Sequence, residues 1–169
     1  MIRAAMMSSE RINWNTPENA LHLVYRHMGQ IDLDPCSNPE SIVKAELALS
    51  LENGDNGLTQ PWEGRVYVNP PYGREISWWV LKCLRESKLP RCLEIIALLP
   101  ARTDTGWFEE CWKADAICFW KGRLTFLGAQ HPAPFPSCLV YWGPQPERFY
   151  GIFSIAGKVI FPKVISPQR

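Results

Sequence analysis

Asn69, Pro70, Pro71 and Tyr72 place more reactive groups close together than any other stretch of this sequence. They follow residues 65–68, an apolar and β-branched run that predicts a short buried strand. Proline cannot donate to a strand ladder, so the strand must end here and the chain must leave in a stiff turn. The turn therefore holds an amide, free backbone carbonyls and an aromatic ring near one another.

These groups suit the binding of a planar amine. An amide oxygen on Asn69 and the carbonyl of Pro70 can together accept both hydrogens of an exocyclic amino group. The two prolines place the ring of Tyr72 where it can stack on the flat base that carries this group. The tetrad therefore predicts an amine held for attack. The alternative is a proline-terminated strand end with a packing tyrosine.

Other predicted strands also end in polar residues. Residues 30–34 predict a strand that ends at Asp34-Pro35, and a carboxylate at such a strand end is where doubly wound sheets bind nucleotide-like ligands. The alternative for Asp34 is a cap on its own strand end. Asp32 lies on the same strand face and is either a ligand or a buried structural carboxylate. Residues 92–99 predict a strand buried on both faces that leads to Arg102, which either contacts a phosphate or base edge or is an exposed loop charge.

Three helix starts are predicted. Thr16 can cap a helix with Pro17 at its first position and Gly29 closing it. Residues 37–40, Ser-Asn-Pro-Glu, form a capping box that predicts a short helix. Thr103 or Asp104 can cap another.

A further helix is predicted over residues 75–88, with its tryptophans in the core.

The remaining runs complete an alternating pattern. Strands are predicted at 47–51, 116–120 and 137–142, with an edge strand near Val159. Residues 52–57 are rich in turn-forming residues, which predicts a hairpin or a surface turn. The resemblance given below favours a ligand-binding loop instead. Residues 128–136, rich in proline, predict a mobile loop over the site. Strands alternating with helices predict a three-layer α/β sandwich.

Bulk properties limit the function classes. The 169 residues fit one domain, here residues 13–169, after a loose N-terminus at 1–12. The formal net charge of +1 means that any DNA-facing charge must be a local patch. The six cysteines form no C-x-x-C motif, and no signal peptide is apparent, which predicts reduced thiols in a cytoplasmic protein. The three histidines have no metal-ligand spacing, and no apolar run is long enough for a membrane span.

Five motifs in order carry a resemblance to a known family. They are Trp14-Asn15-Thr16-Pro17, residues 32–36 (DLDPC), residues 55–58 (DNGL), the tetrad, and residues 99–105 (LPARTDT). Together they resemble the phage-type DNA N6-adenine methyltransferases of the Dam-like family, which belong to the S-adenosylmethionine-dependent amino methyltransferases. The resemblance runs from about Asn13 to about Trp142.

The resemblance implies a mostly parallel, Rossmann-like sheet with one antiparallel edge strand. It also implies S-adenosylmethionine as cofactor, with Asp55 accepting from its adenine and Glu52 reaching its ribose. The predicted cofactor-binding residues are Trp14, Thr16, Pro17, Asp34, Pro35 and Asp55. This sequence departs from the wider class in one respect, because no Gly-x-Gly follows Asp34.

The resemblance and the tetrad together predict transfer of a methyl group to N6 of a flipped adenine in double-stranded DNA. Arg102, Lys121 and Arg123 are predicted to form a basic rim for the DNA. We expect a monomer that needs no metal, acting in the cytoplasm of a bacterial host if a phage encodes it. Two alternatives stay open: methylation of RNA adenine or protein glutamine, and a non-catalytic nucleic-acid-binding module of the same fold.

Overall fold

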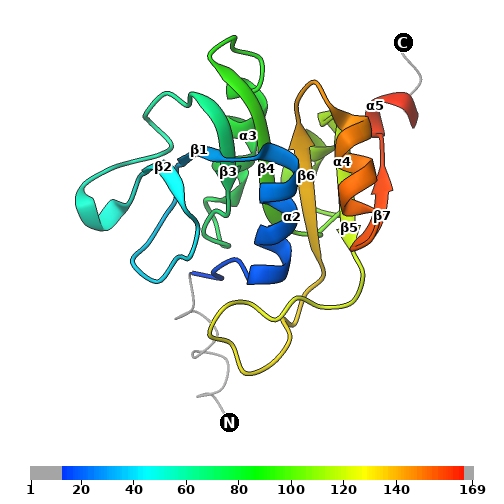
Figure 1. The fold of residues 1–169 in the computed structure, drawn as a ribbon, viewed down its shortest axis with the longest axis horizontal. Helices are drawn as coiled ribbons and strands as arrows, with labels where there is room; N and C mark the ends of the chain where they lie inside the picture. Colours follow the sequence, from blue (N-terminus) through cyan, green and yellow to red (C-terminus); the bar gives the residue numbers. More distant parts are fainter. Residues whose placement is uncertain (1–12, 166–169) are drawn as a thin grey trace.

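A seven-stranded sheet organises the structure, a computed structural model that describes residues 13–165 (Figure 1). The predicted loose segment 1–12 lies outside the described residues. The strand order is β2-β1-β3-β4-β6-β5-β7. The strands are β1 (Ile31–Asp34), β2 (Ala45–Ala48), β3 (Gly64–Val68), β4 (Cys92–Pro100), β5 (Ala116–Trp120), β6 (Ser137–Trp142) and β7 (Gly157–Ile160).

Strand direction brings five strand ends to one side of the sheet. β1, β2, β3 and β4 are mutually parallel, and β6 is antiparallel to both β4 and β5. β5 therefore runs in the same direction as β4. The carboxyl ends of β1 to β5 meet at one side, which we call the carboxyl edge. A ligand site is expected at this edge in open α/β sheets.

The prediction of one antiparallel edge strand is confirmed, but a second antiparallel strand was not predicted. β7 is an antiparallel edge strand, paired with β5, but β6 is a second antiparallel strand and lies inside the sheet. The chain returns from β5 to β6 through a loop at the carboxyl edge. A direct return of this kind gives antiparallel pairing without a crossover helix.

Helices cover both faces of the sheet, which confirms the three-layer α/β prediction. The α-helices are α2 (Glu18–Met28), α3 (Ile76–Glu86), α4 (Pro146–Phe153) and α5 (Pro162–Ile165), and the 3₁₀ helices are η2 (Leu51–Asn53) and η3 (Gly106–Lys113). One buried cluster joins α2 and α4 to the sheet, and a second joins α3 and η3 to the opposite face. In Figure 1, α2 and α4 lie in front of the strands and α3 behind them.

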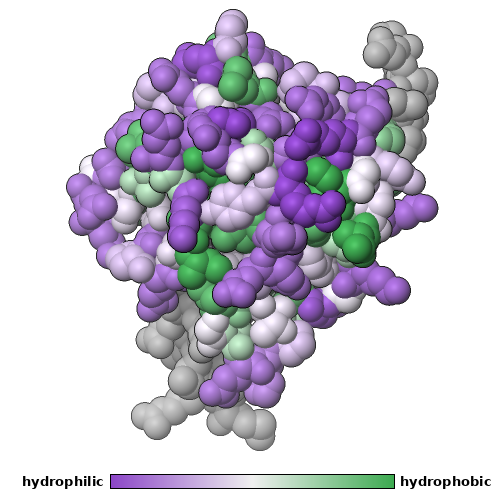
Figure 2. Space-filling model, viewed as in Figure 1, coloured by the Kyte–Doolittle hydropathy of each residue, from purple (hydrophilic) through white to green (hydrophobic). Residues whose placement is uncertain are grey.

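β4 shows why the sheet lies between two cores. Its alternate residues Ile96 and Leu98 belong to the α2–α4 core, whereas Ile95, Ala97 and Leu99 belong to the other. A strand with helices on both faces needs a continuous apolar run, which the sequence has here. On the face that carries α2 and α4, the surface is mostly hydrophilic, with hydrophobic side chains in small separate patches (Figure 2).

Two of the predicted caps were wrong. α2 begins after Pro17, without a side-chain cap, because the hydroxyl of Thr16 is bonded elsewhere. The 3₁₀ helix η3 begins after Thr105, without a side-chain cap, so neither Thr103 nor Asp104 caps it.

The predicted helix after Ser37 was also wrong, because this segment forms turns. The Asn38 side chain accepts from the Glu40 amide at 3.1 Å, and its carbonyl accepts from Ser41. Such local side-chain bonds compete with helix formation.

The predicted strand over 47–51 is shifted. β2 spans Ala45–Ala48, and residues 51–53 turn into η2, capped by the Ser50 hydroxyl. The hairpin alternative for residues 52–57 is wrong, because β1 lies between β2 and β3. These residues therefore form a loop at the carboxyl edge.

The six thiols are free, as predicted, and five of them are buried. Burial raises the pKa of every one, to about 12 for Cys92 and Cys118. Within residues 13–165, no group of three His, Cys, Asp or Glu side chains is arranged to hold a metal ion. No helix in the same part of the chain is long and apolar enough to cross a membrane.

Candidate active site

Asn69 lies at the carboxyl end of β3 with its amide held from one side. Its Nδ2 donates to the backbone carbonyl of Trp14 and, at 3.2 Å, to Oγ1 of Thr16. Its Oδ1 is buried and has no hydrogen-bond partner among the described residues. A backbone carbonyl can only accept, so the nitrogen must face Trp14 and the oxygen must point the other way. A buried acceptor without a partner is costly, so this oxygen is available to a hydrogen-bond donor.

Two buried hydroxyls lie behind this amide. Oγ1 of Thr16 and the hydroxyl of Tyr67 are 2.6 Å apart, and both residues are buried. Burial raises the pKa of the Tyr67 hydroxyl far above its usual value, so this group stays protonated.

Tyr72 is held by contacts at both its hydroxyl and its ring. Its hydroxyl donates to the Leu98 carbonyl at 3.0 Å. Phe126 and Phe135 pack in T-shaped arrangements with its ring, at centroid distances of 6.3 and 5.6 Å. Trp14 contacts the same two phenylalanines, both at 5.3 Å. Two phenylalanines of the loop between β5 and β6 thus pack against both Tyr72 and Trp14.

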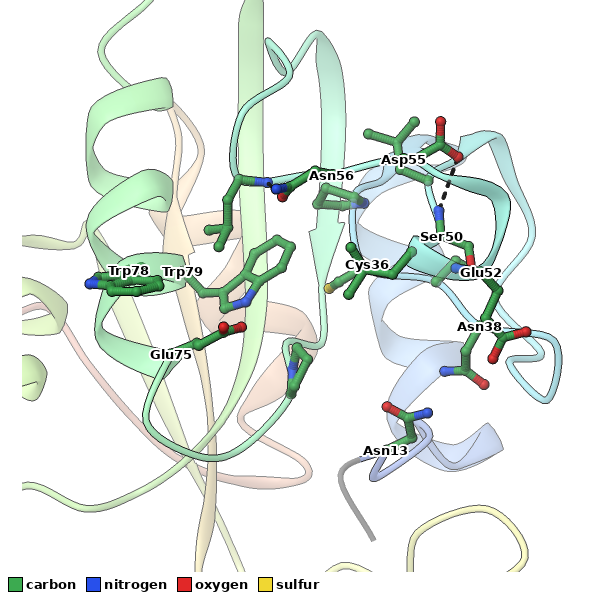
Figure 3. Close-up of a pocket in the computed structure, with 17 residues that line it drawn as sticks. Asn13, Cys36, Asn38, Ser50, Glu52, Asp55, Asn56, Glu75, Trp78 and Trp79 are labelled. Atoms are coloured by element: carbon green, nitrogen blue, oxygen red, sulfur yellow. Dashed lines mark hydrogen bonds between the residues drawn. The ribbon is translucent and has the colours of Figure 1, made fainter. Parts of the chain in front are cut away.

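A pocket of about 330 Å³ opens beside the tetrad (Figure 3). Its walls come from the turn after β1, the loop after β2, and Pro71 with the start of α3, and Asn13 also lines it. In Figure 3, Trp78, Trp79 and Glu75 face Cys36, Ser50 and Glu52 across the opening. The volume falls within the range of small-molecule and cofactor sites.

The charged residues that line this pocket are all acidic: Glu52, Asp55 and Glu75. Oδ2 of Asp55 accepts from the Ser50 amide at 3.2 Å, which fixes the carboxylate at the pocket wall. Such a lining favours cationic ligands and ligands rich in hydroxyl or amino donors.

Gly57 brings two walls of the pocket together. A Cβ at this position would lie 1.9 Å from the Pro35 carbonyl oxygen. Only glycine allows the loop after β2 to approach the turn after β1 this closely.

The two carboxylates of β1 have different surroundings. Asp34 is buried, does not line the pocket, and accepts at 3.1 Å from the Cys36 amide. Burial raises its pKa to about 6. Asp32 binds the Arg65 guanidinium at 2.9 Å, and this partner lowers its pKa to about 2. Of the two alternatives for Asp32, the structural carboxylate is therefore correct.

Pro35 and Asp55 line the pocket, whereas Trp14, Thr16 and Pro17 do not. The N-terminal segment reaches the pocket through Asn13. Two residues further on, Asn15 exchanges side-chain hydrogen bonds with Asn38, which also lines the pocket; the shorter bond is 2.7 Å.

Sequence reasoning missed several lining residues: Asn13, Asn38, Asn56, Glu75 and Trp78. The expectation that both tryptophans of α3 lie in the core was wrong for Trp78, which is 60% exposed at the pocket. Helical spacing did carry a signal here, because Trp78 lies outside the apolar face that Trp79 continues.

Comparison with known proteins identifies the family. The model of the DNA N-6-adenine-methyltransferase (Dam) family matches residues 3–138, which is most of the chain. The chain belongs to this family. It is also similar to a curated relative named DNA N-6-adenine-methyltransferase, from Escherichia phage T1, with 24% identity over 69% of this chain. The chain spans 54%, or about half, of that relative's length.

Membership of the Dam family implies a methyl donor, and the pocket fits the usual one. S-adenosylmethionine carries a positive sulfonium and donor groups on its ribose, adenine and amino acid ends. The acidic lining, the size of the pocket and the Gly57 approach suit such a ligand.

The predicted basic rim of this Dam family member lies at the carboxyl edge. Arg102 follows β4, and its guanidinium is 5.9 Å from the centre of the Phe135 ring. Lys121 and Arg123 follow β5, and all three residues are exposed. The structure thus brings the three cations to the same edge as Asn69.

A second pocket, of about 490 Å³, lies where the N-terminal segment meets the loop that follows β5. The backbone carbonyl of Asn15 accepts there from the Leu127 amide at 2.9 Å. In Figure 1, the loop between β5 and β6 and the segment before α2 lie at the same end of the molecule.

Proposed function

We propose that this chain transfers a methyl group from S-adenosylmethionine to N6 of an adenine in DNA. The observation that carries the proposal is Oδ1 of Asn69, a buried acceptor that has no partner among residues 13–165. Asn69 lies two residues before Pro71, which lines the pocket. Family membership supports the reaction class. We expect the chain to act as a monomer on DNA in the cytoplasm.

Asn69 and Pro70 would act on the amine. The N6 lone pair of adenine is delocalised into the ring, which makes the amine a poor nucleophile. Acceptance of its two hydrogens by Oδ1 of Asn69 and the Pro70 carbonyl would favour a pyramidal nitrogen whose lone pair faces the pocket. Alignment and fixed dipoles would supply most of the rate.

The pocket would hold the cofactor. S-adenosylmethionine supplies an electrophilic methyl group when bound. Asp55 and Glu52 would accept from its adenosine part, and Pro35 and Asp34 would shape the turn beneath it. Trp14, Thr16 and Pro17 would contribute indirectly, as the segment that carries Asn13 to the wall of the pocket.

The base must leave the duplex to reach this site, because a stacked adenine cannot present N6 to a donor at the edge of a sheet. Tyr72 would stack on the flipped base. The basic residues Arg102, Lys121 and Arg123 would bind the phosphates on either side.

Radiolabelled methyl transfer tests the proposal. Wild-type protein is given labelled S-adenosylmethionine with adenine-containing duplexes, with RNA of the same sequence, and with glutamine peptides. We expect label in duplex adenine. The matched control is Asn69→Ala, which should lose about 10²–10³ in rate and keep its cofactor affinity.

Each rival predicts a different result. Label in RNA or peptide alone would move the same chemistry to another substrate. A duplex that binds but never acquires label, with no cofactor binding by calorimetry, would indicate a non-catalytic module. Asn69→Ala with more than about a tenth of the wild-type turnover would remove Asn69 from the mechanism.

A further inference from the structure

A continuous chain of hydrogen bonds runs from Tyr67 through Thr16 to Asn69. The Tyr67 and Thr16 oxygens are 2.6 Å apart, and Thr16 accepts from Nδ2 of Asn69 at 3.2 Å. Tyr67 and Asn69 are two residues apart on β3 and its extension, so their side chains point to the same face of the sheet.

This chain bears on the orientation of the amide. An asparagine side chain can turn by 180°, and only one orientation presents oxygen rather than nitrogen to an amine. The Trp14 carbonyl fixes one hydrogen of Nδ2, and Thr16 holds the other. The Trp14 carbonyl sets which way the amide faces, and loss of the Thr16 contact would leave Nδ2 held at one point only.

The Thr16 hydroxyl is a reliable acceptor only if it is itself held. A hydroxyl can donate as well as accept, so alone it could also bind a turned amide oxygen. Thr16 is 2% exposed and Tyr67 is fully buried, so neither hydroxyl has water as an alternative partner. When Thr16 donates its one hydrogen to the Tyr67 oxygen, 2.6 Å away, Thr16 can only accept from Nδ2 of Asn69.

We propose that Thr16 and Tyr67 are positioning residues, which hold the Asn69 amide with Oδ1 toward the substrate amine. The inference rests on the proposed function and adds two residues to it. Neither touches the substrate; they act through Asn69. Thr16 then serves the methyl acceptor side of the reaction and not the cofactor directly.

Steady-state kinetics of Thr16→Val and Tyr67→Phe test this role. Both changes remove one hydroxyl and keep the shape of the side chain. We expect Thr16→Val to lower kcat by about tenfold, the effect of one hydrogen bond, with KM for cofactor and DNA within about twofold of wild type. Tyr67→Phe should lower kcat in the same direction by a smaller factor.

Two controls separate positioning from general damage. Thr16→Ser keeps the hydroxyl and should recover most of the turnover that Thr16→Val loses. Tyr141→Phe removes another fully buried tyrosine hydroxyl, bonded to Glu94 away from the site, and should lower stability without changing kcat. In the double variant, Tyr67→Phe should add little to Thr16→Val, because the two hydroxyls act in series.

A second readout does not depend on activity. The side-chain amide protons of Asn69, assigned by their loss in Asn69→Ala, report their hydrogen bonds by NMR. In Thr16→Val one of the two proton signals should move upfield. No movement, or a Thr16→Val kcat within about twofold of wild type, would overturn the proposal. If the wild-type protein does not methylate adenine, the proposed function is rejected instead. The amide signals would still show whether Thr16 binds the Asn69 amide.

Discussion

Tyr72 is bound at its hydroxyl and packed at its ring, and these two contacts have separate consequences. Tyr72→Phe removes only the hydrogen bond to Leu98. We expect it to lower the free energy of unfolding by about 1 kcal/mol, because the Leu98 carbonyl loses a buried donor, and to keep turnover. Tyr72→Ala should lose most activity on duplex DNA. Denaturant unfolding and methyl transfer measure the two effects.

The contrast between duplexes distinguishes stacking from packing. Extruding the base costs a few kcal/mol, and stacking on one ring returns roughly 1–3 kcal/mol. A mismatch opposite the adenine reduces this cost, so it should partly rescue Tyr72→Ala. Equal, wild-type turnover of Tyr72→Ala on matched and mismatched duplexes would show that the ring only packs.

Asp34 destabilises the folded protein at neutral pH. Its folded pKa of about 6 lies above the ordinary 3.8, so the folded state binds the proton more tightly and stability falls as pH rises from about 4 to about 6. Asp34→Asn keeps the acceptor for the Cys36 amide and removes the charge. We expect it to raise the free energy of unfolding above pH 6 by roughly 3 kcal/mol, with no difference below about pH 4.

Asp32→Asn is the control of opposite sign. Its folded pKa of about 2 is below the ordinary value, so its stabilisation is present above about pH 4 and is lost as pH falls toward 2. Asp32→Asn should therefore lower stability at neutral pH. A rise in stability for both variants would mean that removal of negative charge alone is responsible. If Asp34 also supports the cofactor, Asp34→Asn will weaken its binding in calorimetry.

At the scale of elements, the pocket depends on the contact between the loop after β2 and the turn after β1. Gly57→Ala would place a methyl group against the Pro35 carbonyl, so the two segments must separate. We expect a loss of about 1–3 kcal/mol in the free energy of unfolding and weaker cofactor binding by calorimetry. Gly106→Ala is the matched control, because no atom lies within 4 Å of its added Cβ. Unchanged affinity in Gly57→Ala would place the cofactor elsewhere.

The ends of β4 and β5 carry the basic rim. Removal of Arg102, Lys121 or Arg123 should lower affinity for all DNA sequences and reduce the slope of log affinity against log salt by about one unit. Lys88, an exposed lysine before β4 at the opposite edge, is the control. If a variant loses affinity only for DNA that carries one particular base, the residue contacts that base and not a phosphate. No effect at any of the three would place the DNA on another face.

Element prediction succeeded where a signal lies in neighbouring residues. The double proline ended β3 at the tetrad, and the apolar run of β4 gave a strand between two cores. The interior position of β6 was missed, because its alternation is the same whichever strands lie beside it. The hydrogen bonds of Thr16 were missed for a similar reason. Its partners Tyr67 and Asn69 are 51 and 53 residues away, and no local pattern records such bonds.

At the scale of the whole molecule, a buried network around Glu94 lies near the amino end of β4, at the edge of the sheet opposite the candidate site. Away from the site, Glu94 accepts from Tyr141 at 2.9 Å and binds His27 at 3.0 Å. Burial alone would raise the Glu94 pKa, but these partners lower it, so its stabilisation is lost as pH falls through that lowered value. Glu94→Gln should cost about 1–3 kcal/mol of unfolding free energy at pH 7 and leave kcat unchanged below the melting temperature. A reduced kcat in folded Glu94→Gln would couple the two edges.

The interior place of β6 also sets the order in which the chain can fold during synthesis. β4 and β5 are made first, yet they are not neighbours in the sheet, and β6 fills the space between them. Until Trp142 has left the ribosome, β4 has an unpaired apolar edge and β5 has no strand to pair with. A nascent chain stalled before residue 137 would expose that edge to other chains, the situation in which aggregation and chaperone binding are expected.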